Sequence, residues 1–395
     1  MKPMEIAPQI YDVGVTDWTV RDFHGYKTER GASYNSYLIM DEKICLIDTV
    51  KACYAEELLE KISRVTDPAR IDYVVVNHVE PDHAGALPQV LKAAPNAKFV
   101  ITMQGKNEAL RHYGDGFDFM VVKEGDTIDL GQRKLTFVPV PMLHWPDNMV
   151  TYCPQDGILF SNDAFGQHYA NSNRFDDLVN EDELFYEAKK YFANILWPYA
   201  RLIDGALKKV SALDIKMIAP AHGVIWRSKI KEIVARYAEW GVGVKDGSVV
   251  IAYDTMWGGT EALAGGDTAP LAVLEGAAAA GAGVKLMRMD RTPYSTVAAE
   301  LFEASALLVG SPTLNSGVMP NIGGMLIYLK GLQPKGKKAA AFGTCGWAGG
   351  AQKDMEALLT AAGCDLQPGF NCKWRANGDE VEAARQFAYE FVKNL

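Results

Sequence analysis

The stretch Val76-Asn77-His78-Val79-Glu80-Pro81-Asp82-His83-Ala84-Gly85 places four candidate metal ligands within six residues. Val76 is also the last residue of the run 73–76, whose β-branched and aromatic side chains predict a buried strand. Because Pro81 blocks a regular helix through the segment, we expect a loop whose side chains converge. Imidazole and carboxylate groups gathered at the end of a strand are typical of a metal site, and we predict one here.

Three more candidate ligands stand just beyond other predicted strands: His144, Asp163 and His222. If these strand ends meet at one rim of a sandwich, the whole set offers four imidazoles and three carboxylates. That is enough for two metal ions when one carboxylate bridges them. A single histidine after a strand is more often a hydrogen-bonded loop residue, so the prediction depends on the complete set.

The chain changes character near the glycine-rich segment 241–247, since all seven histidines lie before it. The first part combines short strand-like runs with an amphipathic helix predicted over about 182–212 and interrupted near Pro198, which favours an α/β sandwich. The second part alternates strands and helices, which predicts a doubly wound parallel sheet. We therefore predict two domains, 1–248 and 249–395.

Composition narrows the function classes. With 395 residues, 48% of them hydrophobic and 23% charged, the chain is typical of a folded protein and not of a disordered one. No run is long enough to span a bilayer and no signal peptide is visible, so we expect a cytoplasmic protein without membrane contact. The net charge of −9 argues against a nucleic-acid partner. The six cysteines never form Cys-x-x-Cys, which excludes a disulfide scaffold, a zinc ribbon and an in-chain rubredoxin-type iron site.

Three loops of the second domain share a pattern. Residues 253–261 combine hydroxyls, two glycines and the start of a helix after the first strand, which suits a phosphate monoester. Residues 310–317 and 342–350 are similar Gly- and Thr-rich loops at later strand ends. One such turn is most often an ordinary connection, but ligands of doubly wound sheets bind at the carboxyl ends of the strands. No Gly-x-Gly-x-x-Gly follows these strands, so a nicotinamide cofactor is not expected.

The first domain resembles the metallo-β-lactamase fold family, whose hydrolases carry His-x-His-x-Asp-His at the ligand loop. Here Glu80 stands where the second histidine would be, and a carboxylate there makes the site harder and more anionic, which suits iron. This substitution, with Asp163 between His144 and His222, resembles the flavodiiron proteins over essentially the whole chain. The resemblance implies an N-terminal metallo-β-lactamase-like αβ/βα sandwich followed by a flavodoxin-like doubly wound parallel sheet.

The same resemblance implies two cofactors, a pair of non-haem iron ions and FMN. The flavodiiron pattern assigns His78, Glu80 and His144 to one iron and Asp82, His83 and His222 to the other. Asp163 would bridge the two irons together with an oxo or hydroxo group. The three loops of the second domain are similar to those of flavodoxins, although flavodoxins usually have small hydroxyl residues at positions 256 and 257. The residues that we expect to bind FMN are Thr255, Met256, Trp257, Gly258, Gly259, Thr260, Ser311, Pro312, Thr313, Leu314, Asn315, Thr344, Cys345, Gly346, Trp347, Ala348 and Gly349.

The resemblance further implies reduction of dioxygen to water, of nitric oxide to nitrous oxide, or both. Because the chain has no rubredoxin-type iron site of its own, we expect electrons from a separate protein such as rubredoxin. The family pattern also implies a head-to-tail homodimer or a dimer of dimers, in which the FMN of one chain lies beside the iron ions of another. The main alternative is a metallo-β-lactamase-fold hydrolase with a regulatory flavodoxin-like module, and a second is an electron-carrier or redox-sensing protein with a vestigial metal site.

Other residues have less certain roles in the sequence. His24 is a candidate for the surroundings of the ligands or the substrate pocket, and Tyr26 and Tyr191 are candidates to offer a proton or a hydrogen bond to the bound gas, but structural roles fit all three as well. His112 and His168 are expected to be solvent-facing or structural.

Overall fold

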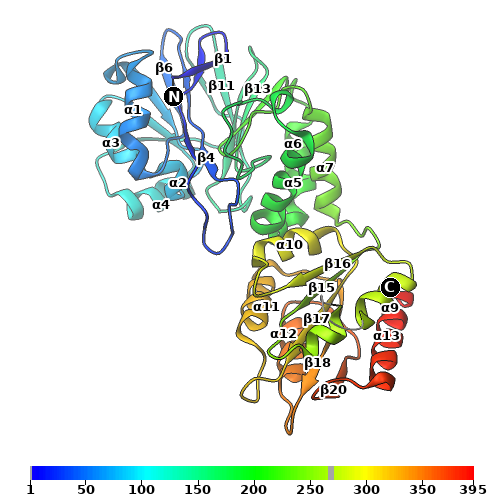
Figure 1. Cartoon of the computed structure of the whole chain (residues 1–395). Coiled ribbons are helices and arrows are strands. Elements are labelled where there is room, and N and C mark those ends of the chain that lie inside the picture. The colour runs from blue at the N-terminus through cyan, green and yellow to red at the C-terminus, as the bar shows by residue number, and fades with distance from the viewer. Residues whose placement is uncertain (1, 266–270) are drawn as a thin grey trace. The chain divides into compact units, whose positions relative to one another are not determined.

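Two compact units make up the chain in the computed structural model, which describes residues 2–265 and 271–395 (Figure 1). The first unit comprises Met1–Phe23, Thr28–Tyr191 and Tyr199–Val242, and the second comprises His24–Lys27, Phe192–Pro198 and Gly243–Leu395. The main part of the second unit thus begins shortly before the boundary that the sequence analysis set at residue 249. Two short segments from earlier in the chain also belong to it.

The first unit contains two large sheets that pack face to face. Across the first sheet the strands are β1 (Met4–Ala7), β2 (Ile10–Asp12), β5 (Tyr37–Ile39), β6 (Ile44–Ile47), β7 (Ile71–Val75), β8 (Lys98–Ile101) and β9 (Asp118–Val121). Across the second they are β10 (Thr127–Asp129), β11 (Lys134–Pro139), β12 (Met149–Cys153), β13 (Ile158–Asn162) and β14 (Met217–Pro220). A small separate pair consists of β3 (Val15–Asp17) and β4 (Ala32–Tyr34).

Strand β6 shows why the first sheet is covered on both faces. All four of its residues are buried, and successive side chains point to opposite sides of a strand. Leu46 packs in a cluster with Leu58 of a flanking helix, whereas Ile47 packs with Phe160 of the second sheet. A continuous apolar run such as this one therefore predicts a strand buried on both faces.

Helices cover the outer faces of the two sheets. Figure 1 shows one helical layer beside the first sheet and another beside the second, which completes an αβ/βα sandwich. The first layer contains α1 (Ala55–Ser63), α3 (Leu87–Ala93) and α4 (Met103–Tyr113), and the second contains α5 (Glu181–Tyr191), α6 (Ile203–Val210) and α7 (Ile230–Val242).

The long helix predicted over about 182–212 is interrupted in the region around Pro198. After α5 the chain forms a π-helical stretch, Phe192–Leu196, and a 3-10 helix, Trp197–Leu202, before α6 begins. Pro198 lies in the 3-10 segment, because proline has no N–H for the helical ladder and its ring clashes with the preceding turn. The predicted interruption is confirmed.

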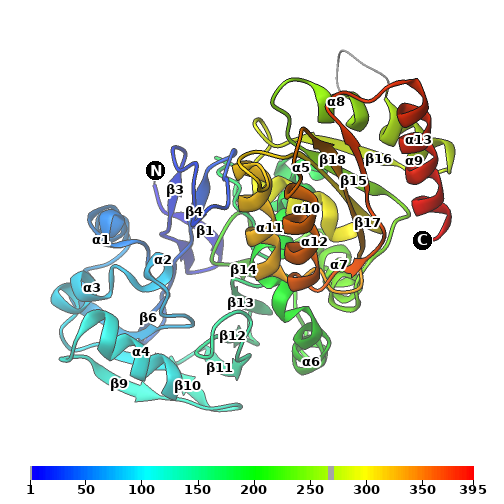
Figure 2. The ribbon, with the colours of Figure 1, turned by 90° about the horizontal axis from the view of Figure 1, so that it is seen from below.

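The second unit is a parallel sheet between two helical layers. Its strand order is β16 (Val284–Arg288), β15 (Val249–Tyr253), β17 (Ala306–Pro312), β18 (Lys338–Cys345) and β19 (Asp365–Leu366), and β20 (Phe370–Lys373) also pairs with β18. Figure 2 shows α10 (Tyr294–Glu303), α11 (Pro320–Leu332) and α12 (Ala351–Ala361) on one face and α9 (Ala272–Ala279) and α13 (Gly378–Lys393) on the other. The short helix α8 (Gly259–Ala264) follows β15.

Strand β15 is buried on both faces, as a central parallel strand requires. Val250 packs in the cluster that includes Leu326 of α11, whereas Val249 packs in the cluster that includes Ala388 of α13. The predicted doubly wound parallel sheet is confirmed. Among the described residues, no helix has both the length and the apolar character needed to cross a membrane.

Candidate functional site

The ligand segment after β7 differs from its prediction in one respect. We expected Pro81 to exclude helix, but Pro81–Ala84 forms a single helical turn, α2. Pro81 occupies the first turn, where a backbone N–H would have no partner inside the helix and its loss costs nothing. Glu80 precedes this turn while Asp82 and His83 lie on it, so the proline starts the helix instead of preventing it.

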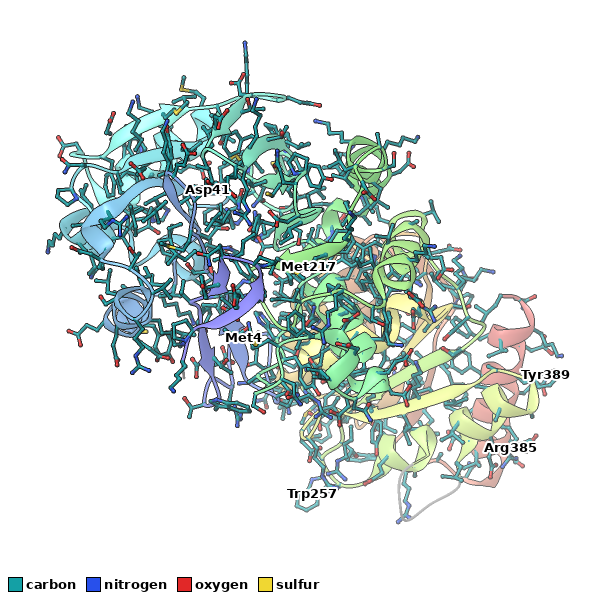
Figure 3. The ribbon with its side chains drawn as sticks, turned by 90° about the horizontal axis from the view of Figure 1, so that it is seen from above. Met4, Asp41, Met217, Trp257, Arg385 and Tyr389 are labelled. Atoms are coloured by element: carbon teal, nitrogen blue, oxygen red, sulfur yellow. The ribbon has the colours of Figure 1, made fainter. Side chains whose placement is uncertain are left out.

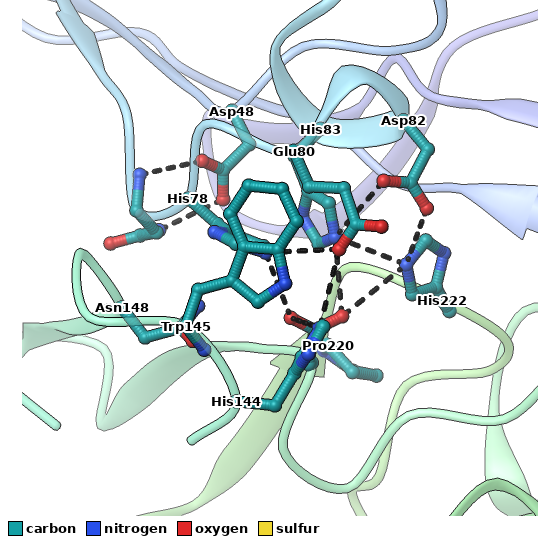
Figure 4. Close-up of polar contacts among 12 residues, drawn as sticks. Asp48, His78, Glu80, Asp82, His83, His144, Trp145, Asn148, Pro220 and His222 are labelled. Atoms are coloured by element: carbon teal, nitrogen blue, oxygen red, sulfur yellow. Dashed lines mark hydrogen bonds and ion pairs between the residues drawn. The ribbon is translucent and has the colours of Figure 1, made fainter. Parts of the chain in front are cut away.

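Two groups of candidate ligands converge in the first unit. In each group the ligand atoms lie within 4.8 Å of one another, and the groups are His78, His144 and Asp163, and Asp82, His83 and His222. The loops that carry them leave β7, β11, β13 and β14, so the predicted gathering at one rim is what the structure shows. Figure 4 shows the side chains of Glu80, Asp82, His83, His144 and His222 directed toward a common centre.

Asp163 lies between the two groups. Its Oδ2 is 3.7 Å from Nε2 of His78 and 3.6 Å from Nε2 of His144. Its Oδ1 is 3.2 Å from Nε2 of His83 and 3.5 Å from Nε2 of His222. One carboxylate therefore turns one oxygen toward each group, which is the arrangement that a bridging ligand requires.

The remaining carboxylates each belong to one group. Glu80 Oε2 lies 3.2 Å from Nε2 of His78 and 3.3 Å from Nε2 of His144. Asp82 Oδ2 lies 3.3 Å from Nε2 of His222, and its Oδ1 lies 3.7 Å from Nε2 of His83. Each group thus combines two imidazoles with one carboxylate of its own and a share in Asp163.

Burial shows that these residues fit metal ions. The side chains of Asp82 and Asp163 are almost fully buried, yet Asp82 Oδ1 and Asp163 Oδ2 have no hydrogen-bond partner among the described residues. A buried carboxylate oxygen without a partner costs free energy that a coordinated cation would recover. The mixture of imidazole and carboxylate is also a donor set that suits iron.

The charged groups of the cluster shift one another's pKa in opposite directions. Burial raises the pKa of Glu80, but hydrogen bonds from His144 and His78 outweigh it and lower that pKa to about 2. Burial lowers the pKa of His222, but hydrogen bonds to Asp163 and Asp82 raise it to about 10. Without metal His222 therefore holds a second proton near neutral pH, and a bound cation would displace it.

Partners outside the ligand set orient the imidazoles. Nδ1 of His78 lies 3.0 Å from both carboxylate oxygens of Asp147, which also accepts the backbone N–H of Val79 at 2.8 Å. Nδ1 of His222 lies 2.7 Å from the backbone oxygen of Ser33. Such partners fix the ring so that Nε2 faces the metal. The sequence analysis missed both residues, although Asp147 stands only three positions after His144.

The residues with uncertain roles are distributed differently. Tyr191 donates its O–H to Asp163 Oδ1 at 2.7 Å, so it belongs to the cluster. His24 and Tyr26 lie in a segment that is grouped with the second unit, and their predicted role stays a prediction. His112 is exposed on α4, while His168 is buried with its ring centroid 5.3 Å from that of His222.

A cavity of about 510 Å³ lies in the second unit, at the carboxyl ends of its strands. Its lining includes most residues that the sequence analysis expected to bind FMN, namely Thr255, Met256, Trp257, Gly259, Pro312, Thr313, Leu314, Asn315, Thr344, Cys345, Gly346, Trp347 and Ala348. Trp257 is 94% exposed and projects from the ribbon (Figure 3). Ser316, from the predicted loop 310–317, also lines the cavity, and Trp374 and Arg375 line it without having been predicted.

Four expected FMN residues do not line this cavity: Gly258, Thr260, Ser311 and Gly349. Thr260 is fully buried, and its Oγ1 lies 3.1 Å from Oγ1 of Thr344. The Ser311 hydroxyl donates to the carbonyl of Pro312 and accepts the N–H of Met319. These two hydroxyls therefore stabilise the cavity loops by bonding to other residues of the chain, and they do not face the cavity. Thr255 Oγ1, by contrast, is buried without a partner among the described residues, which fits a ligand in the cavity.

Comparison with known proteins identifies the family. Residues 32–223 match the family described as ODP family beta lactamase, and residues 251–387 match flavodoxin. A protein named nitric oxide reductase from Moorella thermoacetica is 44% identical over 100% of this chain and 99% of its own length. The crystal structure of the flavodiiron protein from Giardia intestinalis superposes with a TM-score of 0.95 at 38% identity, covering 100% of this chain and 96% of that one. The chain belongs to the flavodiiron protein family.

Other flavodiiron relatives agree in fold. The rubredoxin oxygen:oxidoreductase of Desulfovibrio gigas has a TM-score of 0.94 and 38% identity, with 100% of this chain and 98% of that one covered. The anaerobic nitric oxide reductase flavorubredoxin of Klebsiella pneumoniae is 40% identical over 96% of this chain and 80% of its own length. The predicted fold, a metallo-β-lactamase-like domain before a flavodoxin-like domain, is confirmed. This flavodiiron protein is an oxidoreductase, with a flavodoxin domain that binds FMN and a metal-binding domain of the type that holds iron.

Proposed function

We propose that this flavodiiron protein reduces nitric oxide to nitrous oxide, dioxygen to water, or both, with electrons from a protein donor such as rubredoxin. Relatives named nitric oxide reductase and rubredoxin oxygen:oxidoreductase support this proposal. The observation that carries it is the position of Asp163, whose two oxygens face two separate ligand groups. A pair of adjacent redox metals serves the reduction of a small gas molecule, whereas hydrolysis needs no flavin and no electrons.

The ligands would divide as the family pattern implies. His78, Glu80 and His144 would hold one iron, Asp82, His83 and His222 the other, and Asp163 would bridge them with an oxo or hydroxo group. When bound, the iron pair supplies electrons and open coordination positions, and FMN supplies further electrons. The cavity loops 255–259, 312–316 and 344–348 would hold FMN.

The chain's own residues define where a gas molecule would approach. Glu80 and His144 are each 15% exposed, whereas the ligands of the other group are buried almost completely. Solvent therefore reaches the cluster on the side of the first group, and we infer that the substrate enters there.

Tyr191 has a role that its hydrogen bond defines. Burial and the nearby charge of Asp163 raise its pKa well above the ordinary tyrosine value. The phenol therefore stays protonated at any working pH and acts as a hydrogen-bond donor to Asp163 Oδ1. It positions the bridging carboxylate, and a proton consumed in the reaction has to come from elsewhere.

Anaerobic stopped-flow mixing tests the function. The fully reduced, iron-loaded protein is mixed with dioxygen and with nitric oxide in separate experiments, and flavin reoxidation is followed. We expect reoxidation with one or both gases at rates far above those of free reduced FMN, and the ratio of the two rates defines the substrate. Reoxidation no faster than free flavin with either gas would exclude the proposed function.

We also propose the head-to-tail homodimer, or a dimer of such dimers, that the flavodiiron resemblance implies. Its role would be to bring the FMN of one chain beside the iron ions of its partner. Light scattering of the eluting holoprotein measures the mass of the assembly. A strictly monomeric protein that retains full activity would contradict this arrangement.

A further inference from the structure

The cavity of the second unit is lined in part by a segment that the sequence did not single out. Trp374 and Arg375 directly follow β20 and line the cavity together with the loops of the strands before it. The backbone N–H of Trp374 donates to the carbonyl of Cys345 at 2.8 Å, which ties the segment to the loop after β18. Segments remote in sequence thus meet at this cavity.

Two glycines show how closely this segment approaches the other loops. A Cβ atom added at Gly259 would lie 2.9 Å from the carbonyl oxygen of Trp374. A Cβ atom added at Gly346 would lie 2.9 Å from the indole ring of Trp374. Gly259 begins α8 and belongs to the segment predicted to bind phosphate, and Gly346 belongs to the loop after β18. The segment is therefore held between these two loops, and Arg375 follows directly from this anchor.

Among the described residues that line the cavity, Arg375 is the only charged one. Within the described parts of the chain, no hydrogen bond or ion pair engages its guanidinium group. Arg288, at the end of strand β16 beside β15, is by contrast already paired with Glu261 at 2.9 Å and with Asp290 at 2.9 Å. Arg375 is thus the cation that remains available to a ligand in the cavity.

The predicted phosphate loop lines the cavity with no charged side chain. A phosphate monoester carries a charge of about −1.5 to −2 at pH 7. Of the cavity-lining residues in this loop, only Thr255 offers a hydroxyl, because Met256 and Trp257 are apolar. Thr260 lies behind the loop with its hydroxyl against Thr344. The backbone N–H groups and the hydroxyl of this loop can bind a phosphate but carry no full charge, whereas a guanidinium group adds a positive charge and two parallel hydrogen bonds.

We propose that Arg375 binds the phosphate of FMN and thereby makes the cavity select phosphorylated flavin over riboflavin. Trp374 positions it through its hydrogen bond to Cys345 and its packing against Gly259 and Gly346. The inference deepens the proposed function and rests on it, since it takes the cavity to be the FMN site. To the loops predicted from the sequence, the inference adds a positively charged contact to the phosphate from the segment after β20.

Flavin titration of the metal-loaded, flavin-free protein tests the proposal. FMN and riboflavin are each titrated by the quenching of their fluorescence, with wild type, Arg375→Met and Lys373→Met. Lys373 is an exposed cation at the end of the same strand that does not line the cavity, so its substitution is a matched control for charge. We expect Arg375→Met to weaken FMN binding by about 10- to 100-fold, as for the loss of a charge-assisted hydrogen bond, and to leave riboflavin binding unchanged. Lys373→Met should bind both flavins as the wild type does.

The outcomes separate this inference from the proposed function. Equal FMN affinity in Arg375→Met and Lys373→Met would overturn the role of Arg375 and leave the cavity as the flavin site. Equal weakening of FMN and riboflavin in Arg375→Met would also overturn it, because the residue would then support the loops or the ring. Arg375→Lys keeps the charge without the planar fork, and we expect it to bind FMN between wild type and Arg375→Met. A wild type that binds neither flavin would reject the proposed FMN site itself.

Discussion

Asp147 offers a sharp test of how the cluster is built, because it contacts a candidate ligand without being one. Its two carboxylate oxygens each lie 3.0 Å from Nδ1 of His78, and one of them accepts the N–H of Val79 at 2.8 Å. In Asp147→Asn one of the two oxygens becomes an NH₂ group. That group faces either the N–H of Val79 or the Nδ1–H of His78, and in both cases a donor meets a donor.

The magnitude follows from the interaction that is lost. A hydrogen bond to a charged group contributes about 1.5–3 kcal/mol. Since 1.4 kcal/mol corresponds to a tenfold change in affinity, we expect Asp147→Asn to weaken one iron site by roughly 10- to 100-fold. The group of Asp82, His83 and His222 makes no contact with Asp147 that the structure records, so the second site should keep its affinity.

Anaerobic titration of the metal-free protein with ferrous iron, in competition with a chelator, measures both affinities. Asp176→Asn is a matched control, because Asp176 is also buried and accepts backbone N–H groups, but those of residues 227–229. Retention of FMN reports that each variant is folded. If Asp147→Asn binds both irons as tightly as Asp176→Asn, the view that Asp147 orients His78 for metal binding is wrong.

Three further changes have defined outcomes. Glu80→His replaces a carboxylate of the first group with imidazole and should raise the ratio of bound zinc to bound iron roughly tenfold, or ~1.4 kcal/mol, as metal analysis after loading from an equal mixture would show. Burial raises the pKa of Glu187 to about 7. Between the ordinary carboxyl pKa and pH 7, the folded protein therefore keeps a proton on Glu187 that the unfolded chain has released. The free energy of unfolding then falls as the pH rises through this range. From pH 5 to pH 8 the wild type should therefore lose about 2.5 kcal/mol more stability than Glu187→Gln, measured by urea unfolding. Lys337→Met removes the amine that donates to the carbonyls of Val244, Phe302 and Ala304 and should destabilise the second unit by about 2–4 kcal/mol, measured in the same way.

Each of these predictions has a result that contradicts it. An unchanged zinc-to-iron ratio in Glu80→His would show that this position does not set the metal preference. Parallel stability curves for wild type and Glu187→Gln across the pH range would show that Glu187 is not protonated on folding. The exposed Lys335 controls for charge near Lys337, and equal unfolding midpoints for Lys335→Met and Lys337→Met would show that the three hydrogen bonds contribute nothing.

Strands were predictable where their side chains are buried on both faces. The run 73–76 was predicted as a buried strand, and three of its four residues form the end of β7, Ile71–Val75. A strand that is buried on both faces needs consecutive apolar and β-branched residues, and such a run can be recognised in a short window of sequence. The turn at Pro81 was misjudged because proline is unfavourable inside a helix but neutral at its start, and only the position of the turn distinguishes the two cases.

Residues that act on a distant segment were not predictable in the same way. Asp147 faces His78, which lies 69 positions earlier, and no local pattern distinguishes it from other loop aspartates. Trp374 reaches Gly346 and Gly259 only because β20 pairs with β18. Such contacts depend on how strands pair, which a window of sequence does not report.

The sequence by itself determined the chemistry that is available to this protein. Seven imidazole and carboxylate residues beyond strand ends, with Glu80 in place of a histidine, indicated a metal pair suited to iron, and three strand-end loops indicated a flavin. The tertiary structure decided how those groups are used. It turns one oxygen of Asp163 toward each ligand group, places the Tyr191 hydroxyl on that carboxylate and brings Arg375 to the cavity. The physical reason is one of range: residue type sets which atoms can bind a metal or a phosphate, whereas coordination and hydrogen bonding act over about 2–3 Å, and only packing between remote segments brings atoms that close.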